Sequence, residues 1–171
     1  GINIVQAENW STDWYFEEVD DADVSFTASI NKGNEWATMY LPYAVAIPDG
    51  VDVFYAVEGA IAGKTINLTP LNGTIPARTA VLLRREGDAP STEATARFKF
   101  DLAEDVEAVA SNLFDGTIMQ TAIDASGAKV YLLINYNKEA FYWMADEYNE
   151  NCVLTGAGAG YVKNDANKCY L

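Results

Sequence analysis

The chain has 171 residues and half of them are apolar, which is enough for one domain with a sizeable hydrophobic core. Eleven Lys and Arg stand against 25 Asp and Glu, and this formal net charge of −14 argues against binding to nucleic acid or docking on anionic lipid. The chain contains no histidine, which excludes Ser-His-Asp and Cys-His catalysis and every His-ligated metal site. No apolar run approaches the roughly 18 residues that a membrane span needs, so we expect no membrane insertion.

Alternation of apolar and polar residues, broken by turn residues, is the strongest local pattern in the chain. Residues 80–84 differ, because the first four of them form a continuous apolar run that is typical of a buried strand. Turns are predicted at Pro48-Asp49-Gly50 and at Asn72-Gly73, the pair that a two-residue hairpin prefers. The predicted strands, in chain order, are residues 24–30, 36–40, 44–47, 51–57, 65–71, 80–84, 98–102, 116–123, 129–135, 140–144, 160–162 and 168–171.

These eleven or twelve short strands, spaced by about 8 to 12 residues, predict an all-β fold. We expect an antiparallel β-sandwich, or a barrel-like arrangement of the same strands. Only residues 103–113 carry apolar side chains at helical spacing, so at most one short helix is expected, and it would lie there.

The acidic residues do not form a recognisable catalytic or metal-binding motif. With 25 carboxylates, many pairs would reach the separation that glycosidases use, and nothing singles one pair out, so we expect a solvated acidic surface and no enzyme. Residues 20–23 and 146–151 are rich in oxygen ligands but lack the EF-hand spacing, which favours exposed loops and leaves bound Ca²⁺ as an alternative. The Gly-Ala-Gly-Ala-Gly run at residues 156–160 lacks the dinucleotide-binding glycine spacing, so no cofactor is expected.

Aromatic residues make up 12% of the chain and suggest two uses. Most of them are expected to fill the core. The alternative is a sugar-stacking surface, for which the candidates by position are Trp10, Trp14, Tyr136, Tyr142 and Trp143.

Four blocks of sequence resemble a known bacterial module. Residues 36–51 (WATMYLPYAVAIPDGV) resemble "ATLYLPFAVTIPEGV", and residues 74–83 (TIPARTAVLL) resemble "IPANTAVLL". Residues 112–117 (NLFDGT) resemble "NLLxGT", and residues 165–171 (DANKCYL) resemble "ANKAYL". Together, over residues 24–171, they are similar to a β-rich domain near the C-terminus of many large secreted and surface proteins of gut and oral anaerobic bacteria. That family has no agreed function.

The resemblance implies a domain organisation. Trp14-Tyr15-Phe16-Glu17-Glu18-Val19 resembles a "WxxEEV" phrase that often ends a lectin-like β-trefoil domain just before this module. We therefore expect residues 1–23 to be a lead-in, as the tail of such a neighbour, and residues 24–171 to be a single β-sandwich domain. We interpret Gly1 as a cloning remnant on a mature or excised fragment.

The resemblance also implies an extracellular or cell-surface location in bacteria, after removal of a signal peptide. In that setting Cys152 and Cys169 are candidates for a disulfide that closes a loop of about 17 residues, worth roughly 3 kcal/mol. The alternative is two buried free thiols. Cys169 stands where the family usually has Ala, so a bridge would be particular to this protein.

The functional hypothesis is a non-catalytic accessory or adhesion module of an exported or cell-surface protein. A carbohydrate-binding module that uses exposed aromatics is the alternative. The expected partners are neighbouring domains of a longer chain and a glycan or protein ligand.

Overall fold

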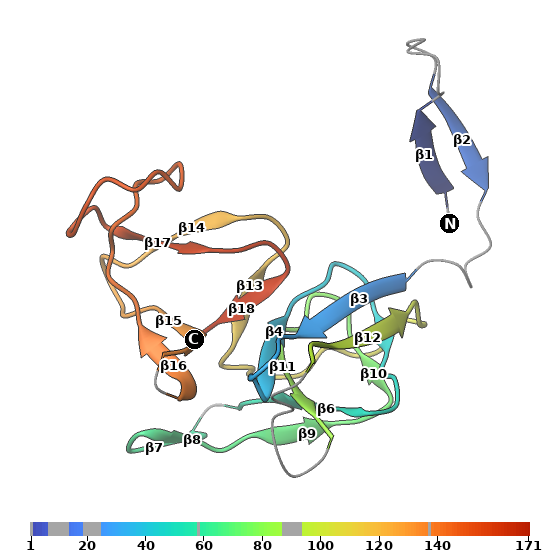
Figure 1. The fold of residues 1–171 in the computed structure, drawn as a ribbon, viewed down its shortest axis with the longest axis horizontal. Helices are drawn as coiled ribbons and strands as arrows, with labels where there is room; N and C mark the ends of the chain where they lie inside the picture. Colours follow the sequence, from blue (N-terminus) through green and yellow to red (C-terminus); the bar gives the residue numbers. More distant parts are fainter. Residues whose placement is uncertain (1, 7–13, 19–24, 58, 87–93, 137) are drawn as a thin grey trace.

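The computed structural model describes residues 2–6, 14–18, 25–57, 59–86, 94–136 and 138–171 (Figure 1). Within these ranges the chain forms eighteen strands and no helix, and every pairing between strands is antiparallel. The predicted all-β antiparallel fold is confirmed, and no set of described strands closes into a barrel.

The strands are more numerous than predicted for three reasons. Residues 2–6 and 14–18 form strands before the first predicted one, and the predicted strands 65–71 and 116–123 each divide into two. Two further strands, at residues 61–62 and 74–75, are only two residues long. Their bounds are β1 (Ile2–Gln6), β2 (Trp14–Glu18), β3 (Ser25–Ile30), β4 (Trp36–Met39), β5 (Val45–Ala46), β6 (Val51–Tyr55), β7 (Ile61–Ala62), β8 (Thr65–Ile66), β9 (Thr69–Leu71), β10 (Thr74–Ile75), β11 (Val81–Arg85), β12 (Ala96–Asp101), β13 (Asp115–Thr117), β14 (Thr121–Asp124), β15 (Tyr131–Asn135), β16 (Glu139–Trp143), β17 (Tyr161–Asn164) and β18 (Lys168–Tyr170).

A four-stranded sheet, in the order β4–β11–β6–β9, is the largest in the molecule. Strand β11 is central, and its Leu83 lies opposite Ala37 of β4 and Val53 of β6. Successive side chains of a strand point to opposite faces, so Leu83 and its neighbour Leu82 enter different cores. Both are buried, which confirms the buried strand that the continuous apolar run predicted.

The first core lies between this sheet and the β3–β12 ribbon. Phe100 of β12 is fully buried and lies opposite Phe26 of β3. Ile30 of β3 is also fully buried, and it joins Val81 and Leu83 of β11 in one apolar cluster. Two antiparallel layers therefore face each other across this core.

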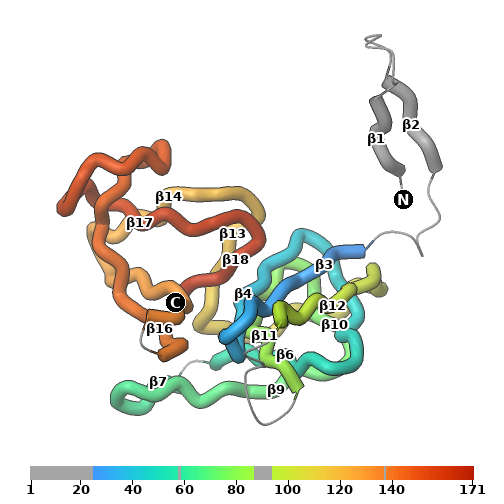
Figure 2. The backbone as a smooth tube through the Cα atoms, viewed as in Figure 1, coloured from blue at the N-terminus to red at the C-terminus, as the bar shows by residue number. Residues whose placement is uncertain are grey.

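The second core covers the opposite face of the four-stranded sheet. Leu82 packs there in a cluster that also contains Phe114 and Cys169, with Phe141 of β16 at its margin. The rings of Phe114 and Phe141 stack with centroids 5.4 Å apart. The chain divides into two halves, β3 to β12 and β13 to β18, which lie mostly on opposite sides of the view in Figure 2, although β7 of the first half extends below β16 of the second.

A buried arginine anchors the end of β3. Arg85 of β11 donates from Nη2 to the carbonyls of Ile30, Asn31 and Ala94, at 2.7, 2.9 and 3.0 Å. These bonds satisfy carbonyls at the end of β3 and just before β12. They also fix the backbone of Asn31 at the edge of the cleft described below.

The short helix considered for residues 103–113 does not form. This segment is held through backbone bonds to other parts of the chain: Ala103 N–H donates to Ala44, and Leu113 N–H donates to Ala56. Val106, part of the apolar stripe that suggested a helix, is 46% exposed. Hydrogen bonds to residues next to β5 and β6 have taken the place of the intrahelical ones.

The two predicted turns differ in outcome. Gly50 has a φ of 84° and closes the turn expected at Pro48-Asp49-Gly50. Gly73 has a φ of 80°, but Asn72-Gly73 does not close a hairpin, because β9 pairs with β6 and β10 pairs with β5. This turn instead carries the chain from one sheet to another.

Candidate binding cleft

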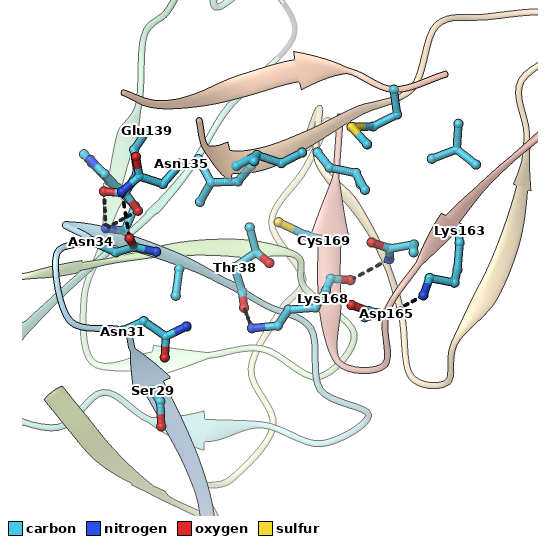
Figure 3. Close-up of a pocket in the computed structure, with 18 of the residues that line it drawn as sticks. Ser29, Asn31, Asn34, Thr38, Asn135, Glu139, Lys163, Asp165, Lys168 and Cys169 are labelled. Carbon is cyan, nitrogen blue, oxygen red and sulfur yellow. Dashed lines mark hydrogen bonds and ion pairs between the residues drawn. The ribbon is translucent and has the colours of Figure 1, made fainter. Parts of the chain in front are cut away.

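A cleft of about 410 Å³ lies between the β3–β4 side of the molecule and strands β15, β17 and β18. Its walls therefore come from both halves of the chain. Its polar lining is drawn in Figure 3 and consists of Ser29, Asn31, Asn34, Thr38, Asn135, Glu139, Lys163, Asp165 and Lys168. Leu132, Ile134, Met144, Tyr148 and Val162 add an apolar wall.

Glu139 closes one end of the cleft. Its carboxylate accepts hydrogen bonds from the backbone N–H groups of Glu35 and Trp36, the latter at 3.2 Å. Partial burial raises the pKa of Glu139, and the two backbone donors oppose that shift. The carboxylate is therefore held by the protein itself.

Two amides lie beside this contact. Asn135, at the end of β15, donates from Nδ2 to Oδ1 of Asn34 at 2.8 Å. The same nitrogen lies 3.5 Å from the carbonyl oxygen of Gly33. The Asn34 Nδ2 and Asn135 Oδ1 atoms have no hydrogen-bond partner among the described residues.

The other side of the cleft carries two lysines. Asn164 is 1% exposed and donates from Nδ2 to Thr117 Oγ1 at 2.8 Å and to the carbonyl of Lys168 at 3.1 Å. Lys168 is exposed, and its Nζ lies 3.5 Å from the Thr38 carbonyl oxygen. Lys163 pairs with Asp165 at 3.8 Å and lies over the ring of Tyr148.

A second, more apolar groove of about 670 Å³ runs between the β7–β8 and β15–β16 hairpins. Ile61, at its rim, is 51% exposed. Trp36, Leu133 and Glu139 line both cavities, so they form the wall between them.

Side chains are described for three of the five predicted sugar-stacking aromatics, namely Tyr136, Tyr142 and Trp143. Trp10 lies outside the described residues, and Trp14 is placed only as the first residue of β2. Tyr136 and Trp143 are 73% and 60% exposed. Tyr136 meets Tyr142 edge to face at 6.3 Å, but Tyr142 and Trp143 are consecutive in β16 and point to opposite faces.

The oxygen-rich clusters differ in how much is described. Residues 20–23, the first of these clusters, lie entirely outside the described residues. In residues 146–151, Asn149 Oδ1 accepts from the N–H groups of Asn151 and Val153, which organises a turn. Across the described ranges, no three His, Cys, Asp or Glu side chains are grouped to hold a metal ion.

The predicted disulfide between Cys152 and Cys169 is not formed in the structure, where both are free thiols. Cys169 is buried in the second core, and its Sγ lies 3.6 Å from the Val81 carbonyl oxygen. Cys152 is half-buried in a turn, with a φ of 59°. The Cys169 sulfur is thus packed against the main sheet.

Sequence reasoning missed the cleft residues. Asn31 and Lys163 belong to none of the motifs, and Lys168 appears only within the terminal block at residues 165–171. Asn31 also lies far from the two lysines in the chain. Strand alternation placed them near strand ends, but only the pairing between strands brings them to one cavity.

The fold and cleft define the class of protein: an all-β antiparallel protein with a polar cavity between its two halves. Comparison with known protein families, with curated proteins and with solved structures finds no match for this chain. The described residues include no apolar helix of membrane-spanning length.

Proposed function

We propose that the chain is a non-catalytic accessory or adhesion module of an exported or cell-surface bacterial protein, and that it holds its ligand in the cleft at Asn31, Asn135 and Lys168. One observation carries the proposal. The cleft offers amide and ammonium groups for hydrogen bonding, whereas the Glu139 carboxylate is already bound by backbone N–H groups.

This arrangement favours binding over catalysis. A general acid or base must reach the proton that it transfers, within hydrogen-bond distance. Glu139 faces the backbone of residues 35 and 36, and Asp165 pairs with Lys163. The amides can both donate and accept, which suits a hydroxylated or peptide ligand.

A carbohydrate-binding module that uses exposed aromatics is the second candidate. It is favoured by Trp143, which is 60% exposed and lines a shallow hollow with Ser126, Lys129 and Asp146. Lys129 Nζ lies 4.8 Å from the centre of the Trp143 ring, so a sugar would stack on the other side of the ring or displace the lysine.

The test is a titration of the whole chain with a panel of glycans and polysaccharides, in which binding is measured by tryptophan fluorescence and by calorimetry. Three variants separate the candidates: Asn31→Ala in the cleft, Trp143→Ala in the hollow, and Asn72→Ala as an exposed amide outside both. The cleft proposal expects saturable binding that Asn31→Ala weakens and the other two leave unchanged.

Other results would decide differently. Binding that is lost only in Trp143→Ala would establish the aromatic module instead. A blank across the panel, with no saturable binding by any variant or by the unaltered chain, would overturn glycan binding at both places. The search would then turn to a protein partner, with the same variants.

A further inference from the structure

We infer that the cleft takes an anionic sugar, a pyranose that carries a carboxylate, and that Lys168 holds the carboxylate. This inference rests on the proposed function, because it names the ligand class of the same cleft. It starts from the charges that line the cavity.

Among the residues that the structure describes, Lys168 is the cation of the cleft without an acidic partner. No carboxylate oxygen of these residues lies within 4.0 Å of its Nζ, which lies 3.5 Å from the Thr38 carbonyl oxygen. Lys163, on the same wall, is paired with Asp165. An ammonium group with one weak contact retains donors for a ligand.

Neither of the two acids of the lining pairs with Lys168. Glu139 accepts from two backbone N–H groups at the far end, and Asp165 is engaged by Lys163. In a chain of net charge −14, an anionic ligand would be repelled by most of the surface. The cleft, where the ammonium group of Lys168 is available, is therefore a place where an anionic ligand can bind selectively.

The position of Lys168 is fixed by a buried residue. Asn164, which is 1% exposed, donates to the Lys168 carbonyl and to Thr117 Oγ1. The backbone from which the ammonium extends is thus held in place, and this lowers the entropy lost when a ligand binds.

The other residues of the lining fit the hydroxyl groups and the apolar face of a sugar ring. Asn34 Nδ2 and Asn135 Oδ1 provide one donor and one acceptor, the pair of functions that a hydroxyl needs. Met144 and Tyr148 provide apolar surface for the C–H face of a ring. The volume of about 410 Å³ is of the size that small-molecule sites use.

The experiment titrates the whole chain by calorimetry with oligogalacturonate and sialyllactose, and with lactose and neutral gluco-oligosaccharides as uncharged counterparts. Lys168→Gln removes the charge. Lys138→Gln, at an exposed position that lines neither cavity, is the matched control. Urea unfolding of both variants verifies that each is folded.

We expect acidic sugars to bind more tightly than the neutral ones. Their affinity should fall about tenfold or more in Lys168→Gln and stay unchanged in Lys138→Gln, because a hydrogen bond to a charged group is lost. Added salt should weaken acidic binding in the unaltered chain.

The inference fails, while ligand binding in the cleft at Asn31 and Asn135 stands, if neutral sugars bind equally well, or if Lys168→Gln binds acidic sugars like the unaltered chain while Asn31→Ala does not. Binding of poly-glutamate or inorganic phosphate as tight as that of the acidic sugars would overturn the assignment to a sugar. The absence of binding to any glycan would remove both proposals.

Discussion

The carboxylate of Glu139 and the backbone N–H of Trp36 are joined by a 3.2 Å hydrogen bond across 103 positions of sequence. This bond fastens the β15–β16 hairpin to the start of β4. It also forms part of the wall that separates the polar cleft from the apolar groove. A single side chain therefore contributes both to the assembly of the two halves and to the shape of the cavity.

The first prediction concerns the pH dependence of this contact. Because burial raises the pKa of Glu139 above 4.5, the folded state favours the protonated carboxyl more than the unfolded state does. The stability that this group contributes is present below its unfolded pKa and decreases as the pH rises through the folded value. We expect the free energy of unfolding of the unaltered chain to fall relative to that of Glu139→Gln as the pH rises above 4.5.

Urea unfolding of both proteins at a series of pH values measures this difference. Glu104→Gln, an exposed position outside the contact, serves as the control for loss of one negative charge. A difference that grows in favour of the unaltered chain as the pH rises would contradict the prediction, because it would mean that the two backbone donors outweigh burial.

The second prediction concerns thiol reactivity. Burial raises the pKa of the Cys169 thiol to about 12, so it carries almost no thiolate at neutral pH. We expect iodoacetamide to label Cys152 first in the folded protein, and Cys169 only after unfolding. Mass spectrometry of the labelled chain, before and after addition of urea, gives the order.

The same measurement tests the disulfide that the sequence suggested. If neither thiol is labelled in urea without a reductant, the two cysteines are bonded in the purified protein. Equal labelling of both in the folded state would show instead that the second core is open to solvent at Cys169.

The third prediction concerns Gly116 of β13. A Cβ built on Gly116 would lie less than 3.0 Å from three atoms of the Tyr40 side chain, namely Cβ, Cγ and Cδ2. Those atoms are close to the backbone and cannot swing away, so Gly116→Ala should destabilise the chain by about 1–3 kcal/mol. Gly127→Ala is the matched control, since nothing lies within 4 Å of its Cβ position. Similar urea midpoints for the two variants would disprove the close approach of Tyr40 to β13.

The fourth prediction concerns the buried amide behind Lys168. Asn164→Ala removes the donor to Thr117 and to the Lys168 carbonyl, and leaves that carbonyl without its partner. We expect a loss of about 1–3 kcal/mol in the free energy of unfolding. Thr117→Val, which removes only one of the two partners, should cost less. A smaller effect for Asn164→Ala than for Thr117→Val would contradict this role.

The parts of the fold that depend only on neighbouring residues in the sequence could be predicted. Strand β11 follows from a run of apolar residues, and Gly50 follows from a turn whose residue types favour it. Residues 103–113 were predicted less well, because their helical spacing is real but their backbone partners, Ala44 just before β5 and Ala56 just after β6, lie far away in the sequence. Local periodicity contains no information about such partners.

The candidate site could not be predicted, for a related reason. Lys168 and Thr38 are 130 residues apart, and their contact depends on β18 lying beside β4. The aromatic candidates could be found by residue type, but Tyr142 and Trp143 were grouped without regard to the alternation of a strand. Side-chain direction in β16 separates them.

The burial of β11 on both faces has a consequence for how the chain behaves when it is cut. Leu82 packs in one core and Leu83 packs in the other. A fragment that lacks either half would therefore expose leucine and valine side chains to water. Such a fragment would self-associate and would not remain monomeric. We therefore expect the two halves to unfold as a single cooperative unit, and the amide hydrogens of β11 to be the last among the described residues to exchange with deuterated solvent.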